Sequence, residues 1–230
     1  MVWKNSPNLS ILKDRMKIPI DGIETRIIGD TLVISSELPL KILSSCILGG
    51  GFTSAKFIIN HHVEKNYHHG SPDEDLQRVV NQLGINENAV GMMTAVDLEN
   101  TSITSQKSVC AVVTGGVSNA IASGESGSSG GTINIILLVD ANLSDAAMVN
   151  AVITATEAKT LALRDLNIKS RKSAEIATGT STDSIVIACM RRGDAIKYAG
   201  PATSLGESIG LATRKAVREA IIKQENLLPI

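Results

Sequence analysis

Aromatic side chains are scarce in this chain of 230 residues, where Phe, Trp and Tyr make up 2% while hydrophobic residues make up 43%. Ile, Val, Leu and Ala must therefore fill the core, a composition that suits α/β or α+β layering. The scarcity leaves few groups that could stack on nucleic-acid bases, and a formal net charge of -1 provides no basic surface for phosphates. Nucleic acid is therefore not an expected partner.

Cysteine pairs and long apolar runs are also missing. Cys46, Cys110 and Cys189 lie far apart, each in an apolar stretch, which predicts three buried reduced thiols. No apolar run approaches the roughly 18 to 20 residues of a membrane span, and the first residues lack the charged-then-apolar order of a signal peptide. We expect a cytoplasmic protein without a membrane partner, folded as a single domain over residues 1–230. The sequence leaves open whether it forms a homo-oligomer.

The pattern of apolar runs predicts an α+β fold of layered sheets with outer helices. Ser144 is placed to cap a long helix over 145–166, whose inward face we expect to include Met148, Val149, Val152, Ile153 and Leu161. Two other helices are expected, one after Ser71 and one over 204–225. Strands are expected as a meander between 9 and 36, at 41–48 and 55–63 around a three-glycine turn, at 89–96, 108–114 and 132–140, and after the polar turn 177–183.

Glycine-rich segments invite a nucleotide-binding interpretation, above all the small-residue stretch 115–131. Glycines let a backbone approach phosphate closely, but this chain has neither the GK[ST] of a P-loop nor a strand-GxGxxG-helix unit. A surface loop or a lid over a binding site explains the glycines equally well.

Small polar residues lie at the ends of three expected strands. Thr114 and Gly115 follow one strand, Thr132 opens another behind Gly131, and the run 178–183 leads into a third. Hydroxyls and free backbone N–H groups are what a site needs to hold a carbonyl or an oxyanion, although ordinary strand-capping turns use the same residues. We expect these three strand ends to converge on one pocket.

Titratable side chains give weaker signals. The histidines form the pairs His61-His62 and His68-His69, and alternation along a strand lets only one of His61 and His62 face a given site. No HExxH spacing is present, and we predict no metal site. On the long helix, Glu157 and Lys159 are two residues apart, so they cannot pair on one helix face, and one of them can face inward.

Taken in order, several long motifs resemble the archaeal-type adenosylcobinamide amidohydrolases, which salvage corrinoids. The resemblance implies hydrolysis of the amide between the aminopropanol arm and a corrin-ring propionate of adenosylcobinamide, giving adenosylcobyric acid and 1-amino-2-propanol for cobalamin biosynthesis. It implies no cofactor, because the substrate itself carries the cobalt. Ser204, where the family is expected to have a basic residue, and His62, in place of a common glutamine, depart from the pattern. The matching stretches are IINHHV (58–63), VGMMTA (90–95), VVTGGVSNA (112–120), GTINIILLVDANLSDAAMVNAVITATEAKTLAL (131–163), ATGTSTDSIVIA (177–188) and YAGPATSLGESIG (198–210).

A fainter resemblance over about a third of the chain bears on mechanism. The order of motifs from Gly131 to Asp183 is similar to the ornithine acetyltransferases and the DmpA-type aminopeptidases, whose chains are cut before an N-terminal nucleophile. This resemblance implies a related fold and makes Thr132 the nucleophile. In an uncut chain, His61, Glu157 or Asp183 would have to act as the base on Thr132 or on a water. From the two resemblances together, the expected substrate-binding residues are Asn60, Thr114, Gly115, Asn119, Gly131, Asn134, Thr180, Thr182, Tyr198 and Thr203.

Two other functions remain open at this point. One is a corrinoid-binding protein that does not hydrolyse its ligand. The other is a nucleotide-binding enzyme that uses the glycine-rich loops.

Overall fold

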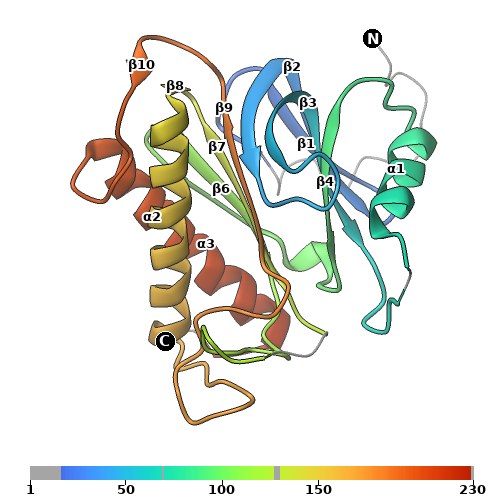
Figure 1. The fold of residues 1–230 in the computed structure, drawn as a ribbon, viewed down its shortest axis with the longest axis vertical. Helices are drawn as coiled ribbons and strands as arrows, with labels where there is room; N and C mark the ends of the chain where they lie inside the picture. Colours follow the sequence, from blue (N-terminus) through green and yellow to red (C-terminus); the bar gives the residue numbers. More distant parts are fainter. Residues whose placement is uncertain (1–16, 69, 127–129, 229–230) are drawn as a thin grey trace.

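A sheet of eight strands dominates the computed structural model, which describes residues 17–68, 70–126 and 130–228 (Figure 1). The strands follow the order β4-β3-β2-β9-β7-β6-β5, and β1 pairs with β2 beside this path. Two short strands, β8 and β10, pair separately. The bounds are β1 Ile23–Ile28, β2 Thr31–Ser44, β3 Gly51–His62, β4 Ala89–Thr94, β5 Ser102–Gln106, β6 Val109–Gly115, β7 Ile133–Val139, β8 Asn142–Leu143, β9 Ser184–Cys189 and β10 Ala195–Ile196.

Strand β2 joins the two halves of the sheet. It pairs with β3 over most of its length, whereas β1 pairs with its first half and β9 with Lys41–Ser44 at its end. The pairing with β3 is irregular between Ser35 and Leu40. The sequence predicts two separate strands here, and a single long strand with an irregular middle forms instead, because each half finds a different second neighbour.

The sheet curls so that its two halves cover each other. One face carries a buried aliphatic cluster to which no long helix contributes, with Ile34, Ile58 and Met92 from one half and Val112 and Ile136 from the other. Three strands separate β3 from β6 in the sheet, yet the side chains of Asn60 on β3 and Thr114 on β6 are hydrogen-bonded. A flat sheet could not bring these two strands into contact. We call the enclosed surface the inner face.

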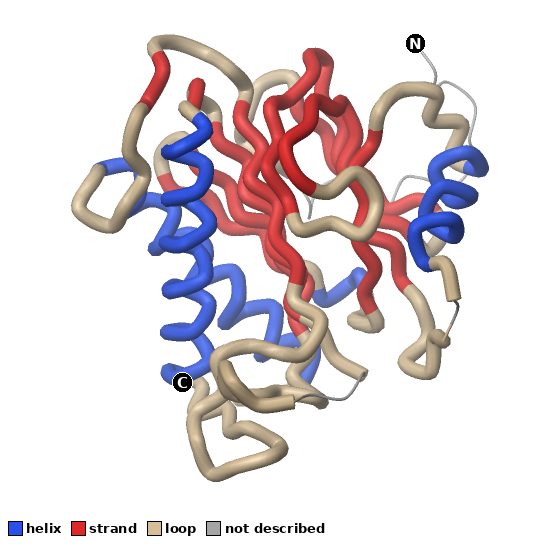
Figure 2. Tube along the Cα trace, viewed as in Figure 1, coloured by secondary structure: helices blue, strands red, loops and turns tan. Residues whose placement is uncertain are grey.

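Three helices cover the outer face (Figure 2). Helix α1, Pro72–Gln82, packs its buried Leu76 and Val80 against Val33 and Ile59 of β2 and β3. Helices α2, Asp145–Asp165, and α3, Ser204–Glu225, cover the outer face of the other half. A short 3-10 helix, η1, spans Leu98–Asn100. The expected α+β arrangement with outer helices is confirmed, but one curled sheet forms both strand layers.

The inward face of α2 differs in part from the one expected, because Met148 is fully buried and Val152 packs against the core as predicted, but two of the predicted residues are exposed. Val149 and Ile153 are 48% and 50% exposed, whereas Ala147, Ala151 and Ala155 are fully buried. Small side chains occupy the contact because α2 packs against both α3 and the sheet. The predicted bounds of α2 and α3 and the cap by Ser144 are confirmed, as are the three buried free cysteines. Within the described residues no helix has the length and apolarity needed to cross a membrane.

Candidate active site

An uncharged polar cluster closes one end of the inner face. Asn60, Thr114 and Asn134 continue the inward-facing rows of Ile58, Val112 and Ile136 on β3, β6 and β7. Asn60 Nδ2 donates to Thr114 Oγ1 at 2.9 Å, and Asn134 Nδ2 donates to Asn60 Oδ1 at 2.9 Å and to the Met93 carbonyl of β4 at 2.8 Å. Each of the three side chains is 1% exposed. Buried amides of this kind are held in one orientation by their partners.

Thr132 lies at the edge of this cluster, 5% exposed, one residue before β7 begins. Its Oγ1 donates to the Thr182 carbonyl at 2.9 Å and lies 3.3 Å from Asn134 Oδ1. Its own carbonyl accepts from Gly116 N at 3.0 Å. Both acceptors of the hydroxyl are amide oxygens, which do not take up a proton at neutral pH. In the continuous chain the Thr132 hydroxyl is therefore placed by its contacts but not activated by them.

Gly131, the residue before Thr132, is closely surrounded. The Thr182 hydroxyl donates to its carbonyl at 2.8 Å. A Cβ at this position would collide with Asn119 Oδ1 and would lie 2.9 Å from the Gly116 carbonyl and 3.0 Å from Ser118 Oγ. Only glycine fits here, so the backbone between residues 131 and 132 is held tightly beside hydroxyl and amide groups.

A charged pair lies behind Thr132, between the outer face and α2. Asp183 Oδ1 accepts from Ile133 N at 3.0 Å and from Thr180 Oγ1 at 2.5 Å, and Lys159 of α2 donates to Asp183 Oδ2. The side chains of Lys159 and Asp183 are 12% and 17% exposed. Of the two candidates on α2, Lys159 faces inward and Glu157 is exposed. Asp183 thus fixes the start of β7, and with it the position of Thr132.

Two loops meet over this end of the sheet. Asn119 Nδ2 donates to Ser181 Oγ at 2.8 Å, Ser118 Oγ donates to the Gly130 carbonyl at 2.6 Å, and Ile121 N donates to the Gly179 carbonyl at 3.0 Å. The expected convergence of the three strand ends is therefore confirmed in the fold. Whether the converging side chains bind a substrate stays a prediction.

His61 lies on the other side of β3 from Asn60. Its ring Nδ1 is 2.8 Å from the hydroxyl of Thr31, which is 2% exposed. Burial lowers the pKa of His61 below its ordinary value of 6.5, and the nearby Asp30 carboxylate only partly opposes this effect. The imidazole lines a hollow of about 460 Å³ on the outer face. Its ring contacts the Thr31 hydroxyl and the backbone of Asp30, and within the described residues no hydrogen bond joins it to Thr132.

Comparison with known proteins decides the family. The model of the adenosylcobinamide amidohydrolase family matches residues 18–229. The chain belongs to the adenosylcobinamide amidohydrolase family. It is 33% identical to an adenosylcobinamide amidohydrolase of Methanosarcina mazei over 83% of this chain and 94% of that protein, and 30% identical to one of Halobacterium salinarum over 66% and 67%. It is also 34% identical to an uncharacterized protein of Methanocaldococcus jannaschii over 91% and 92% of the two chains.

Two of the residues expected to bind substrate in an adenosylcobinamide amidohydrolase lie elsewhere. Tyr198, 68% exposed, and Thr203 belong to the connection after β10, which pairs with β8 beyond the far end of β7. Thr203 caps α3, since its Oγ1 accepts from Gly206 N at 2.9 Å. The structure does not bring these two residues to the cluster around Thr132, because β7 runs its whole length between them.

The sequence did not show which of Glu157 and Lys159 faces the sheet, and it gave no sign of the Met93 carbonyl. The two-residue spacing of Glu157 and Lys159 shows that they point apart but not which one faces the sheet. The buried Ala155, Ala158 and Ala162 on the same helix place Lys159 closer to the inward side. Met93 gives no signal in sequence, because its contribution is a backbone carbonyl. The described residues contain no group of three or more His, Cys, Asp or Glu side chains that could hold a metal ion.

Proposed function

We propose that this chain hydrolyses the amide that links the aminopropanol arm to a corrin-ring propionate of adenosylcobinamide, giving adenosylcobyric acid and 1-amino-2-propanol. The reaction would return cobinamide to cobalamin biosynthesis, and we place it in the cytoplasm. Family membership supports this reaction. The structural observation that carries it is the buried set of hydroxyl and amide groups around Thr132, at a strand end where two loops meet.

In the proposed reaction Thr132 Oγ1 attacks the amide carbonyl carbon of the substrate. The hydroxyl proton passes to a base and then to the leaving nitrogen, so that 1-amino-2-propanol departs and an ester remains on Thr132. Water then cleaves the ester, which releases the carboxylate and restores the hydroxyl. Neutral donors in the surrounding loops, above all backbone N–H groups, are suited to stabilise the oxyanion.

We propose the α-amino group of Thr132 itself as the base. The hydroxyl contacts only amide oxygens, and the Asp183 carboxylate is already occupied by Ile133 N, Thr180 and Lys159. Cleavage of the Gly131–Thr132 bond would free an amine next to the hydroxyl, as in N-terminal nucleophile enzymes. Attack of Thr132 Oγ1 on the Gly131 carbonyl carbon, followed by hydrolysis of the resulting ester, achieves this cut without any other reagent than water.

The reaction is tested by incubating adenosylcobinamide with the purified protein and measuring 1-amino-2-propanol and the corrinoid product by mass spectrometry. Release of both, lost in Thr132→Ala, supports the proposal. Tight cobinamide binding without release would favour a binding protein instead. Thermal stabilisation by ATP or GTP but not by cobinamide would favour a nucleotide-binding enzyme.

The proposed base is tested by the intact mass of the wild-type protein. Two fragments that meet between Gly131 and Thr132 are expected, and Thr132→Ala should remain whole. A single full-length mass for an active enzyme would rule out the freed amine and leave a water, or an internal threonine with another base, as the nucleophile.

A further inference from the structure

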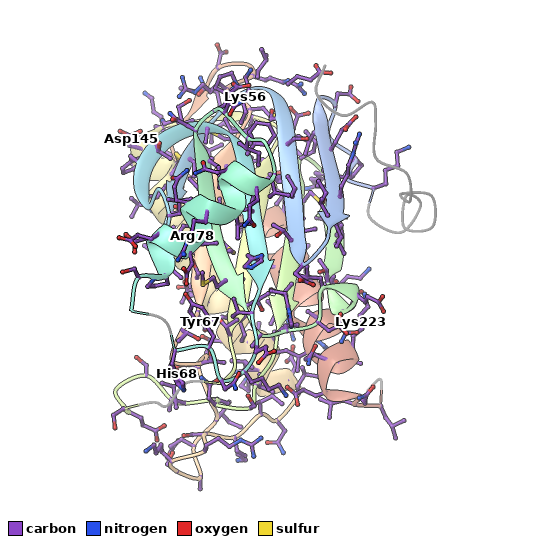
Figure 3. The ribbon with its side chains drawn as sticks, turned by 90° about the vertical axis from the view of Figure 1, so that its right-hand side faces the viewer. Lys56, Tyr67, His68, Arg78, Asp145 and Lys223 are labelled. Atoms are coloured by element: carbon purple, nitrogen blue, oxygen red, sulfur yellow. The ribbon has the colours of Figure 1, made fainter. Side chains whose placement is uncertain are left out.

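A second polar hollow lies on the outer face, at the same end of the sheet as Thr132. It has a volume of about 460 Å³ and is lined by residues from the end of β3, the following loop, α1 and β4, among them His61, His62, Tyr67, His68, Asp75 and Met93. Tyr67 and His68 lie below α1 at the lower end of the molecule (Figure 3). The proposed hydrolysis does not use any of these side chains.

The hollow and the Thr132 cluster share the strands that separate them. Met93 lines the hollow, while its carbonyl accepts a hydrogen bond from Asn134 of the cluster at 2.8 Å. His61 lines the hollow, and its neighbour Asn60 belongs to the cluster. A ligand in the hollow therefore lies on the opposite side of β3 and β4 from Asn60 and Asn134, at the same end of these strands.

The His61 ring is held by the neighbouring strand pair, through the Thr31 hydroxyl on Nδ1 and a backbone hydrogen bond with Asp30. Nδ1 lies 2.8 Å from Thr31 Oγ1, and Thr31 is buried opposite it in the strand pairing. When Nδ1–H donates to this hydroxyl, Nε2 carries the lone pair on the far side of the ring. A hydrogen bond that fixes one nitrogen of a histidine in this way is the usual support for a metal-ligating imidazole.

The number of ligating side chains available restricts which form of metal the hollow can bind. The described residues contain no group of three or more His, Cys, Asp or Glu side chains that could hold a metal ion. Protein sites for a free transition-metal ion generally need three or four such ligands. Cobalt in a corrin ring brings four ring nitrogens with it, and in cobinamide no nucleotide base occupies its lower face. It needs one further axial ligand, which a single fixed imidazole can supply.

We propose that the hollow binds one face of the corrin ring and that His61 Nε2 ligates the cobalt axially. This inference rests on the proposed function for its substrate, and it makes His61 a positioning residue and not a base, one of the roles that the sequence left open for it. The bond between His61 and cobalt holds the ring while the propionate that carries the amide extends towards Thr132. Thr31 orients the imidazole, and Met93 offers an apolar side chain to the ring.

The test is electron paramagnetic resonance of cob(II)inamide bound to the uncut Thr132→Ala protein and to the wild type. An axial nitrogen splits each cobalt line into a triplet, and protein labelled with 15N-histidine should convert the triplets into doublets. His61→Gln should abolish the splitting, and the neighbouring His62→Gln should retain it. Thr31→Val should weaken cobinamide binding by about tenfold, as loss of an orienting hydrogen bond typically does.

Two outcomes overturn the proposal: bound cob(II)inamide without nitrogen splitting in the wild type, or splitting that survives in His61→Gln. The labelled wild type keeps the test valid should His61→Gln fold poorly. Release of 1-amino-2-propanol is measured in parallel. Release of 1-amino-2-propanol without nitrogen splitting refutes the ligation alone. Nitrogen splitting without release of 1-amino-2-propanol refutes the proposed hydrolysis alone. Absence of any cobinamide binding refutes both.

Discussion

The two sides of β3 at its C-terminal end differ in kind, although adjacent residues form them. On the inner face, Asn60 lies in a closed, uncharged network with Thr114 and Asn134. On the outer face, His61 lines an open hollow beside titratable side chains. A strand alternates its side chains between faces, so one step along the chain separates these two environments.

In the proposed assignment, this single strand end serves two tasks. Neutral, rigid hydrogen-bonding groups suit an amide carbonyl and its oxyanion, and a partly open imidazole suits a metal that arrives with its substrate. Variants on the inner face should therefore change turnover and the free energy of unfolding. Variants on the outer face should change corrinoid binding and leave the fold intact.

The largest expected effect belongs to Thr132→Ala. Removal of a nucleophile that acts together with its base lowers kcat by roughly four orders of magnitude or more. Cobinamide affinity should change little, because the hollow on the outer face is untouched. Single-turnover release of 1-amino-2-propanol measures the first quantity and equilibrium titration the second. Turnover at the wild-type rate would remove Thr132 from the mechanism and end the division of tasks between the two faces.

Lys159→Met should cost the most stability. This substitution leaves the Asp183 carboxylate, which is 17% exposed, without its counterion. The same carboxylate still accepts the hydrogen bond from Ile133 N. The free energy of unfolding should fall by about 3 kcal/mol, as when one partner of a buried pair is removed. The matched control is Lys56→Met, whose pair with Glu87 is 30% and 53% exposed and should contribute less than about 1 kcal/mol. Urea unfolding of both variants compares them, and equal losses would contradict the assigned role.

Elements with local signals could be predicted from the sequence. Ser144 caps α2 as predicted, and the predicted helix bounds agree with the structure because caps and helical spacing lie within a few residues. The cap of α3 by Thr203 was not predicted. The strand ends around Thr114, Thr132 and Asp183 could also be identified as converging. The hydrogen-bond partners of these strand ends could not be predicted, because only the curl of the sheet brings Asn60 of β3 to Asn134 of β7. The buried alanine face of α2 could not be predicted either, because it depends on the close packing of α3 against α2.

Asn134→Ala tests the inner network directly. The change leaves Asn60 Oδ1 and the Met93 carbonyl without their donor in a cluster where Asn60 and Asn134 are each 1% exposed. A loss of about 2 kcal/mol in the free energy of unfolding is expected, which is the usual cost of buried groups left unsatisfied. Asn66→Ala is the matched control at the outer hollow, where the exposed side chain should contribute within about 0.5 kcal/mol. Urea midpoints that shift equally in both variants would show that the two faces do not differ as proposed.

The smallest expected effect concerns pH and His61. Because burial lowers its pKa in the folded protein, the unfolded chain takes up a proton near the ordinary value of 6.5 that the folded chain does not yet bind. The contribution of His61 to stability is therefore present above this value and is lost as the pH falls through the lowered pKa. Wild-type protein should lose more stability than His61→Gln between about pH 7.5 and about pH 5, as measured by urea unfolding. Equal losses would mean that the imidazole is as hydrated in the hollow as in the unfolded chain.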